Sequence, residues 1–196
     1  MTSTALQQHS PRGQRLPDRR RAKRGQGVAE FSLCAPIALM MLLGIVEGGF
    51  LMFGVGTAAY ATGEAARVGS EAGNSANADL QMIATILGTG IGQNGVVQVT
   101  EVDIYHLIED PNTGALTVDS NGCGGGGCIN KYDLFGTPLV NPEPWASSLR
   151  DVTNGSSDFM GVTIKYQYRW KSGALIMNGP LSLTAKYYVR LEPQTY

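Results

Sequence analysis

The chain of 196 residues is 43% hydrophobic and is long enough for one membrane helix and one domain of modest size. Its net charge of −1 conceals a split: residues 1–25 carry seven Lys or Arg against Asp18, whereas the rest of the chain carries eight basic and fifteen acidic side chains. The acidic body argues against a nucleic-acid partner, and the basic leader is typical of a membrane-topology signal.

The leader, residues 1–24, has no apolar periodicity and is interrupted by Pro11, Gly13 and Pro17. This composition predicts a disordered segment. The pair Arg19-Arg20 raises the alternative of a twin-arginine export signal. The residues that follow, Arg21 to Arg24, lack the apolar pair of such signals, so we reject that interpretation.

A long apolar run follows, in which Glu47 is the only charged residue between Phe31 and Gly63. A bilayer is crossed by about 20 residues of helix, and a secretory h-region has only about 7–15. We therefore expect one continuous transmembrane helix over residues 26–70, with Pro36 inside it. Basic residues before a first span stay in the cytoplasm, which predicts that the domain at 71–196 is extracytoplasmic.

Small residues recur along this helix, first Gly44 and Gly48, and then at spacing four Gly54, Ala58, Thr62 and Ala66. Such a face predicts close approach by another helix. The alternative is that Gly and Ala are simply frequent in membrane helices.

Three stretches in and around this run, together with Pro36, carry a family resemblance. Gly25-Gln26-Gly27-Val28-Ala29-Glu30-Phe31 resembles the class III signal peptide of type IV pilin-like proteins. Pro36, Leu43-Gly44-Ile45-Val46-Glu47 and Gly63-Glu64-Ala65-Ala66-Arg67 resemble TadE-like pseudopilins of tight-adherence (Flp, or type IVc) pilus systems. The resemblance covers roughly residues 24–70. It is looser at the end of the chain and absent in the residues between these two parts.

The resemblance implies a minor pilin in the cell (inner) membrane, with a single pass and a cytoplasmic N-terminus. It implies cleavage by a prepilin peptidase between Gly25 and Gln26, and places Glu30 and Phe31 in processing and assembly. The implied partners are that peptidase, other pilin or pseudopilin subunits through the N-terminal helix, the membrane platform of pilus assembly and the lipid bilayer. The protein would serve adhesion and secretion either within the fibre or by priming it.

Glu47 is a second acid of the membrane helix, near its outer end. Either its side chain reaches the interface and has no further role, or it is functional.

Residues 71–196 predict an α+β domain with a short helix and a small antiparallel sheet. Leu80, Ile83, Ala84 and Leu87 share one face of a helix over residues 78–87, with Asn77 as N-cap and Gly88 as its stop. Period-two patterns predict strands over residues 160–170 and 181–191, with Asn178-Gly179-Pro180 as a turn between them. Further strands are expected over residues 96–107 and 115–118, and an irregular region over 119–158.

Cys123 and Cys128 flank four glycines in that irregular region. Outside the cytoplasm such a pair predicts a disulfide. A zinc site would need further ligands, and His106 lies too far along the chain to supply one convincingly. Cys34, inside the apolar run, is expected to be a small apolar residue.

No catalytic residues, metal ligands or cofactor are predicted. His106 is the only histidine of the body, and no Gly-x-Ser-x-Gly motif accompanies it. The glycines at 88, 90, 92 and 95 lack a phosphate-binding motif. We therefore expect a structural protein and no enzyme. The alternative function is a signal-anchored exported binding domain that is not processed at Gly25.

Overall fold

The computed structural model describes residues 19–93, 95–124, 126–171 and 179–193. Its contacts divide the chain into two compact units, residues up to Leu42 and Leu43–Tyr196, each described separately. The predicted leader lies largely outside the described residues, as does Asn178, the first residue of the predicted turn at 178–180.

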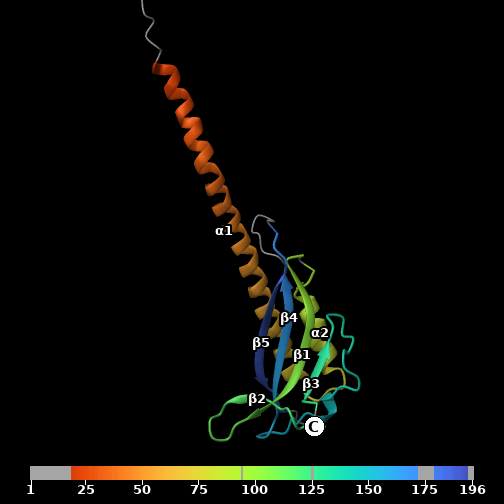
Figure 1. Ribbon diagram of the computed structural model, residues 1–196. Coiled ribbons are helices and arrows are strands. Elements are labelled where there is room, and N and C mark those ends of the chain that lie inside the picture. Colours follow the sequence, from red (N-terminus) through yellow and green to blue (C-terminus); the bar gives the residue numbers. More distant parts are fainter. Residues whose placement is uncertain (1–18, 94, 125, 172–178, 194–196) are drawn as a thin grey trace, which may run out of the picture. The chain divides into compact units, whose positions relative to one another are not determined.

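The first helix, α1, spans Arg19–Ala72 and contains Pro36 (Figure 1). It begins seven residues before the predicted start at 26, so the prediction of a disordered leader up to residue 24 was wrong for its last part. Its other end is close to the expected one. Leu, Met and Ala recur along the apolar run and favour helix, whereas Pro36 and the glycines do not.

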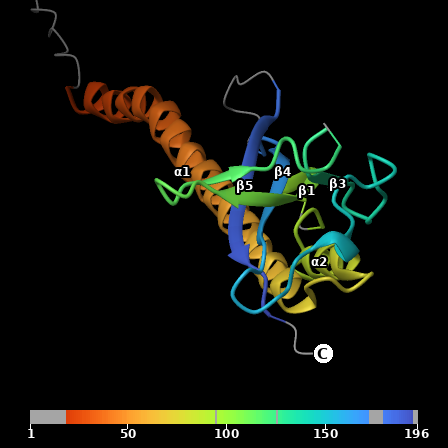
Figure 2. The same ribbon diagram turned by 90° about the horizontal axis from the view of Figure 1, so that it is seen from below.

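The second unit has an antiparallel sheet beside the later part of α1, with a short helix α2 (Figures 1 and 2). Its elements are α2 (Ala78–Gly88), β1 (Val97–Glu109), β2 (Leu116–Val118), β3 (Ile129–Tyr132), β4 (Phe159–Tyr168) and β5 (Leu181–Arg190). The strand order is β2-β1-β4-β5, and β3 also pairs with β1. The predicted α+β class with a long apolar helix is confirmed.

Register gives the sheet two different faces. Val102 lies opposite Ile164, and Ile104 opposite Val162, and all four side chains are buried. On the other face Glu101 lies opposite Lys165, and its carboxylate accepts hydrogen bonds from Lys131 (3.0 Å) and Lys165 (2.7 Å). The hydrogen bond with neighbouring Asp103, followed by those from the two lysines, lowers the pKa of Glu101 to about 2.

The small residues of α1 have a different role from the predicted one. Ala58, Thr62 and Ala66 are fully buried, and a Cβ on Gly54 would lie 2.8 Å from a methyl group of Val97 in β1. From Gly54 onward, this face of small residues therefore packs on the chain's own sheet. At Gly44 and Gly48 a Cβ would meet nothing within 4 Å, so those positions leave room for another helix.

Helix α2 matches its predicted bounds, but it buries a different face. Its buried residues are Ala78, Asp79, Met82, Ile83 and Ile86, whereas Leu80 is 51% exposed. Met82 packs beside Gly69 of α1 and Met160 of β4. This packing explains why the buried face of α2 is rotated from the predicted face toward Met82. Asn77 occupies the N-cap position without a side-chain hydrogen bond.

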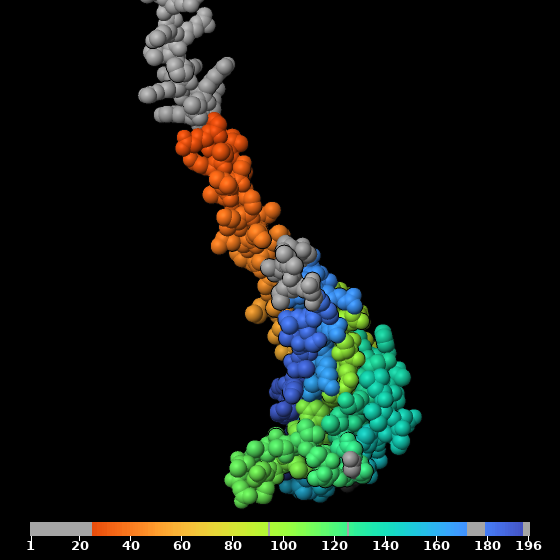
Figure 3. Space-filling view, in the orientation of Figure 1, coloured from red at the N-terminus to blue at the C-terminus, as the bar shows by residue number. Residues whose placement is uncertain are grey.

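The region between β1 and β4, drawn green to cyan in Figure 3, extends from the lower left of the domain across its lower end to the right-hand side. It was predicted to be irregular beyond residue 118, and it contains β3, which sequence reasoning missed. A buried polar network holds it in place. Asp79 of α2 accepts hydrogen bonds from Asn130 and Tyr132, each at 2.8 Å, and pairs with Arg150.

Candidate functional site

The predicted processing segment lies on α1 within the first unit. Residues 25–31 are exposed, and a Cβ on Gly25 would have no neighbour within 4 Å. The side-chain amide of Gln26 donates a hydrogen bond of 2.9 Å to Glu30, one helical turn away. Phe31 is 72% exposed. The segment is thus open to a second protein along its length.

Large apolar side chains follow this segment along α1. The exposed large ones between Leu33 and Val46 are Leu33, Ile37, Leu39, Met40, Met41, Leu42, Ile45 and Val46. Among the described residues, α1 is the one helix long and apolar enough to cross a membrane. Cys34 is exposed among these side chains with a free thiol. The surface is what a lipid-embedded helix requires.

Glu47 lies at the start of the sheet-facing side of α1, within the second unit. Its side chain is only 1% exposed. The Tyr168 hydroxyl and the Lys171 backbone N–H both donate to its carboxylate, the latter at 2.9 and 3.2 Å from the two oxygens. Burial, with a smaller effect of this carboxylate, raises the pKa of Tyr168 to about 12. Glu47 is therefore an acid of α1 whose carboxylate is buried in the domain and accepts hydrogen bonds from residues at and just beyond the end of β4.

Cys123 and Cys128 are joined by a disulfide with a Cα–Cα distance of 5.1 Å, as predicted. The disulfide lies close to His106, which has no other candidate ligand near it in the sequence. The Nδ1 atom of His106 lies 3.1 Å from Asp119 Oδ2, which is 3.5 Å from Cys128 Sγ. The Nε2 atom lies 3.3 Å from Asp158.

These contacts decide what the cluster can do. Both imidazole nitrogens of His106 face carboxylates, and the hydrogen bond that the imidazole donates to Asp158 is the main cause that raises the pKa of His106. The ring also stacks on Trp145, and the Arg150 guanidinium lies over the same indole at 4.4 Å from the ring centroid. With Cys128 engaged in a disulfide, the arrangement joins the β2–β3 and β3–β4 connections to β1. Because Asp119 and Asp158 are distant in sequence, no local signal could have identified them.

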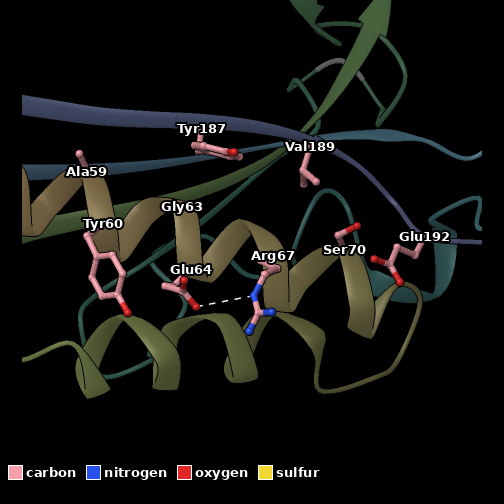
Figure 4. Close-up of a pocket in the computed structure, with 9 residues that line it drawn as sticks. All are labelled: Ala59, Tyr60, Gly63, Glu64, Arg67, Ser70, Tyr187, Val189 and Glu192. Carbon is pink, nitrogen blue, oxygen red and sulfur yellow. Dashed lines mark ion pairs between the residues drawn. The ribbon is translucent and has the colours of Figure 1, made fainter.

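A groove of about 370 Å³ runs between α1 and β5 (Figure 4). Glu64 and Arg67 of α1 form an ion pair along it at 3.7 Å, and Tyr187 of β5 faces them from the other side. At its end the Ser70 hydroxyl donates to the Arg190 carbonyl oxygen at 2.7 Å. The groove has the mixed polar and aromatic lining of an exposed surface, with Tyr60 61% exposed.

Comparison with known proteins gives one result. Residues 25–67 match the family model described as TadE-like protein. No curated protein and no solved structure matches the chain. The matched segment begins at Gly25 and ends at Arg67, so it includes Glu30, Glu47 and the small residues from Gly54 to Ala66 that face the sheet. The resemblance to TadE-like proteins is thereby confirmed over residues 25–67, and this segment indicates a protein associated with the tight-adherence pilus.

Proposed function

We propose that the chain is a minor pilin-like subunit of a tight-adherence pilus system, made as a precursor and cut between Gly25 and Gln26 by a prepilin peptidase. The observation that carries the proposal is the family match, which begins at Gly25. The openness of residues 25–31 supports it, because a peptidase needs access to the backbone around the cut.

The proposed topology has the basic leader in the cytoplasm and residues 71–196 outside. The cluster ending at Arg24 supports this orientation, since cytoplasmic flanks are enriched in Lys and Arg. The disulfide between Cys123 and Cys128 supports it independently, because disulfides persist in oxidising compartments. The bilayer, the peptidase, the assembly platform and other pilin subunits are then the partners.

The proposed role of Glu30 follows from its position. Cleavage creates a positive amine at residue 26, one turn from the carboxylate that the Gln26 side chain now contacts. An unpaired charge inside lipid is costly, by a few kcal/mol or more near the centre. Beside a second pilin-like helix, Glu30 can pair with the neighbour's amine, and the open positions at Gly44 and Gly48 allow that helix to approach.

We further infer a structural role and no enzymatic one. The inference is supported by the engagement of the groups that could react: His106 lies between two carboxylates and the pair Cys123–Cys128 is oxidised.

The substitution Glu30→Gln tests the assembly role. We expect normal insertion, since removing a charge eases it, and a largely normal cut after Gly25. Co-purification with other pilin subunits and the number of surface pili should both fall. The measurement is a pilus count in a deletion strain complemented with each variant, at matched membrane level of the protein.

The matched control is Glu71→Gln, which removes an exposed acid of the same helix that forms an ion pair with Arg67 at 3.7 Å. It should leave piliation unchanged. Normal piliation with Glu30→Gln at normal protein level would show that Glu30 has no role in assembly.

A further inference from the structure

A second hollow lies where β1 begins and β4 ends. Its volume is about 360 Å³, and we name it the basal hollow. Its lining consists of Gly92, Gly95, Val96, Val97, Gln98, Arg169 and Lys171. The lining carries two cationic side chains and no acid, on a domain whose overall charge is negative.

Both cations are positioned by neighbours in the lining itself. A guanidinium N–H of Arg169 donates to the Gln98 side-chain oxygen at 2.8 Å. The Lys171 ammonium donates to the Gly95 carbonyl oxygen. A guanidinium has five N–H donors and an ammonium three, so each contact leaves donors for a ligand. The acid nearest along these contacts is Glu47, which accepts from Tyr168 and from the Lys171 backbone N–H.

The same backbone contact fixes the height of the basal hollow along α1. Lys171 is tied to Glu47, which is 17 residues beyond Glu30. At about 1.5 Å per residue this is about 26 Å of helix, close to the roughly 30 Å of a hydrocarbon core. For a span that begins at Glu30, this length of helix would bring Glu47 and the basal hollow to the opposite boundary, in the headgroup layer.

Aromatic and apolar side chains close to Glu47 and Lys171 along the chain support a position at the membrane boundary. On α1 just beyond Glu47, Phe50, Met52 and Phe53 are 42%, 72% and 56% exposed. Trp170 stands between the two cations in sequence, is half-buried, and packs edge-on against Tyr168 with ring centroids 5.4 Å apart. Trp and Tyr are enriched at membrane interfaces, where an apolar ring and a polar group both find partners.

We propose that the basal hollow binds the phosphate of an anionic phospholipid headgroup between Arg169 and Lys171. Arg presents paired N–H groups to phosphate oxygens, and Lys adds a point charge. The bound lipid would fix the domain against the bilayer surface. The inference rests on the membrane span of the proposed function but not on its orientation, since either leaflet would supply the headgroup at this height.

The first experiment titrates the full chain in detergent with phosphatidylglycerol or phosphatidylcholine and counts retained lipids by native mass spectrometry. We expect preferential retention of phosphatidylglycerol. Removal of each charge should weaken it about fivefold, so the double variant Arg169→Gln/Lys171→Gln should lose the preference. Lys171→Gln keeps the backbone N–H that Glu47 binds. The matched control Lys186→Gln removes an exposed charge on β5 and should change nothing.

Three results would overturn the proposal: equal retention of the two lipids, unchanged retention by the double variant, or displacement of phosphatidylglycerol by an equal concentration of inorganic phosphate. Thermal unfolding of each variant shows that the domain is folded. None of these readouts depends on cleavage at Gly25 or on pili, so this proposal and the proposed function fail separately.

The second experiment locates Trp170 in proteoliposomes that contain lipids brominated close to the headgroup. We expect quenching of tryptophan fluorescence in the wild type and loss of that quenching in Trp170→Phe. The remaining Trp145 is 3% exposed and packs between His106 and Arg150. Identical quenching of wild type and Trp170→Phe would show that the basal hollow does not reach the bilayer.

Discussion

Glu47 shows how one carboxylate can look like a membrane residue in the sequence and be a domain residue in the structure. Its apolar neighbours along the chain suggested either an interfacial side chain or a functional acid in lipid. Both alternatives missed its partners, Tyr168 and Lys171, which lie more than 120 positions away. A helical wheel of α1 places Glu47 in line with Leu51, Gly54 and Ala58, and that alignment is the available signal that it faces the sheet.

The contact between Glu47 and Tyr168 predicts a measurable coupling. Glu47→Gln removes the charge and one acceptor oxygen, and should lower the free energy of unfolding by about 1–2 kcal/mol. Tyr168→Phe removes a buried donor and should cost about 1 kcal/mol. The double variant should cost less than the two single changes together, measured by denaturant unfolding of the full chain in detergent. Strictly additive costs would mean that the two groups do not interact.

The pair of carboxylates around His106 predicts a pH dependence. The folded-state pKa of His106 is raised above 6.5, chiefly by Asp158 and then by Asp119, against opposing burial. A raised pKa means that the imidazolium stabilises the fold fully below about pH 6.5, and that this stability is lost as the pH rises through the folded-state pKa. Trp145 and Cys128, the other contacts around this cluster, do not titrate there.

Unfolding free energies should therefore decrease from pH 6 toward pH 8 in the wild type. His106→Gln should be less stable at pH 6 and should show a flatter profile over the same interval. The carboxylates with lowered pKa values, such as Asp119 and Asp151, act only at more acidic pH and do not interfere. Parallel profiles for the two proteins would contradict the assigned contacts.

At the scale of elements, α1 is both the predicted membrane span and a helix that packs on the sheet. Its apolar composition predicted the span, and its small-residue spacing predicted close packing. The predicted partner in that packing, another helix, was wrong from Gly54 onward, because Val97 and the rest of the sheet pack on this face of small residues. Spacing alone does not tell a partner helix from a sheet, since both exploit a face without bulky side chains.

Gly54 and Gly56 offer a matched test of this packing. A Cβ on Gly54 would lie 2.8 Å from Val97, whereas one on Gly56 would meet nothing within 4 Å. Gly54→Leu should therefore lower the unfolding free energy by about 1–3 kcal/mol through overpacking. Gly56→Leu should leave it unchanged or slightly raised, because Leu favours helix over Gly. Equal stability of the two variants in denaturant would refute the assigned face.

The missed strand β3 has a physical reason as well. Ile129–Tyr132 has only four residues, follows a glycine-rich loop and pairs with the middle of β1. Its stability comes from that pairing and from the bonds of Asn130 and Tyr132 to Asp79 on α2. Contacts of this range leave no trace in a local pattern, whereas the long alternation of β4 made its buried face, from Met160 to Tyr168, predictable.

For the whole molecule, composition predicted the division into a charged leader, an apolar helix and a polar body. The fold class, the span and the disulfide could be predicted because each follows from local composition or spacing. The basal hollow and the His106 cluster could not, because each combines segments that only the folded sheet brings together. The role of residues 25–31 rests on a motif, and the family match from Gly25 supports it.

The intact mass of the protein extracted from its native membrane tests the proposed pilin role most directly. The proposal predicts a mature chain that begins at Gln26, because the cut falls after Gly25. An uncut chain would instead favour a signal-anchored exported domain. A mature start near Thr62, after Ala59-Tyr60-Ala61, would indicate ordinary signal peptidase and would contradict the pilin interpretation.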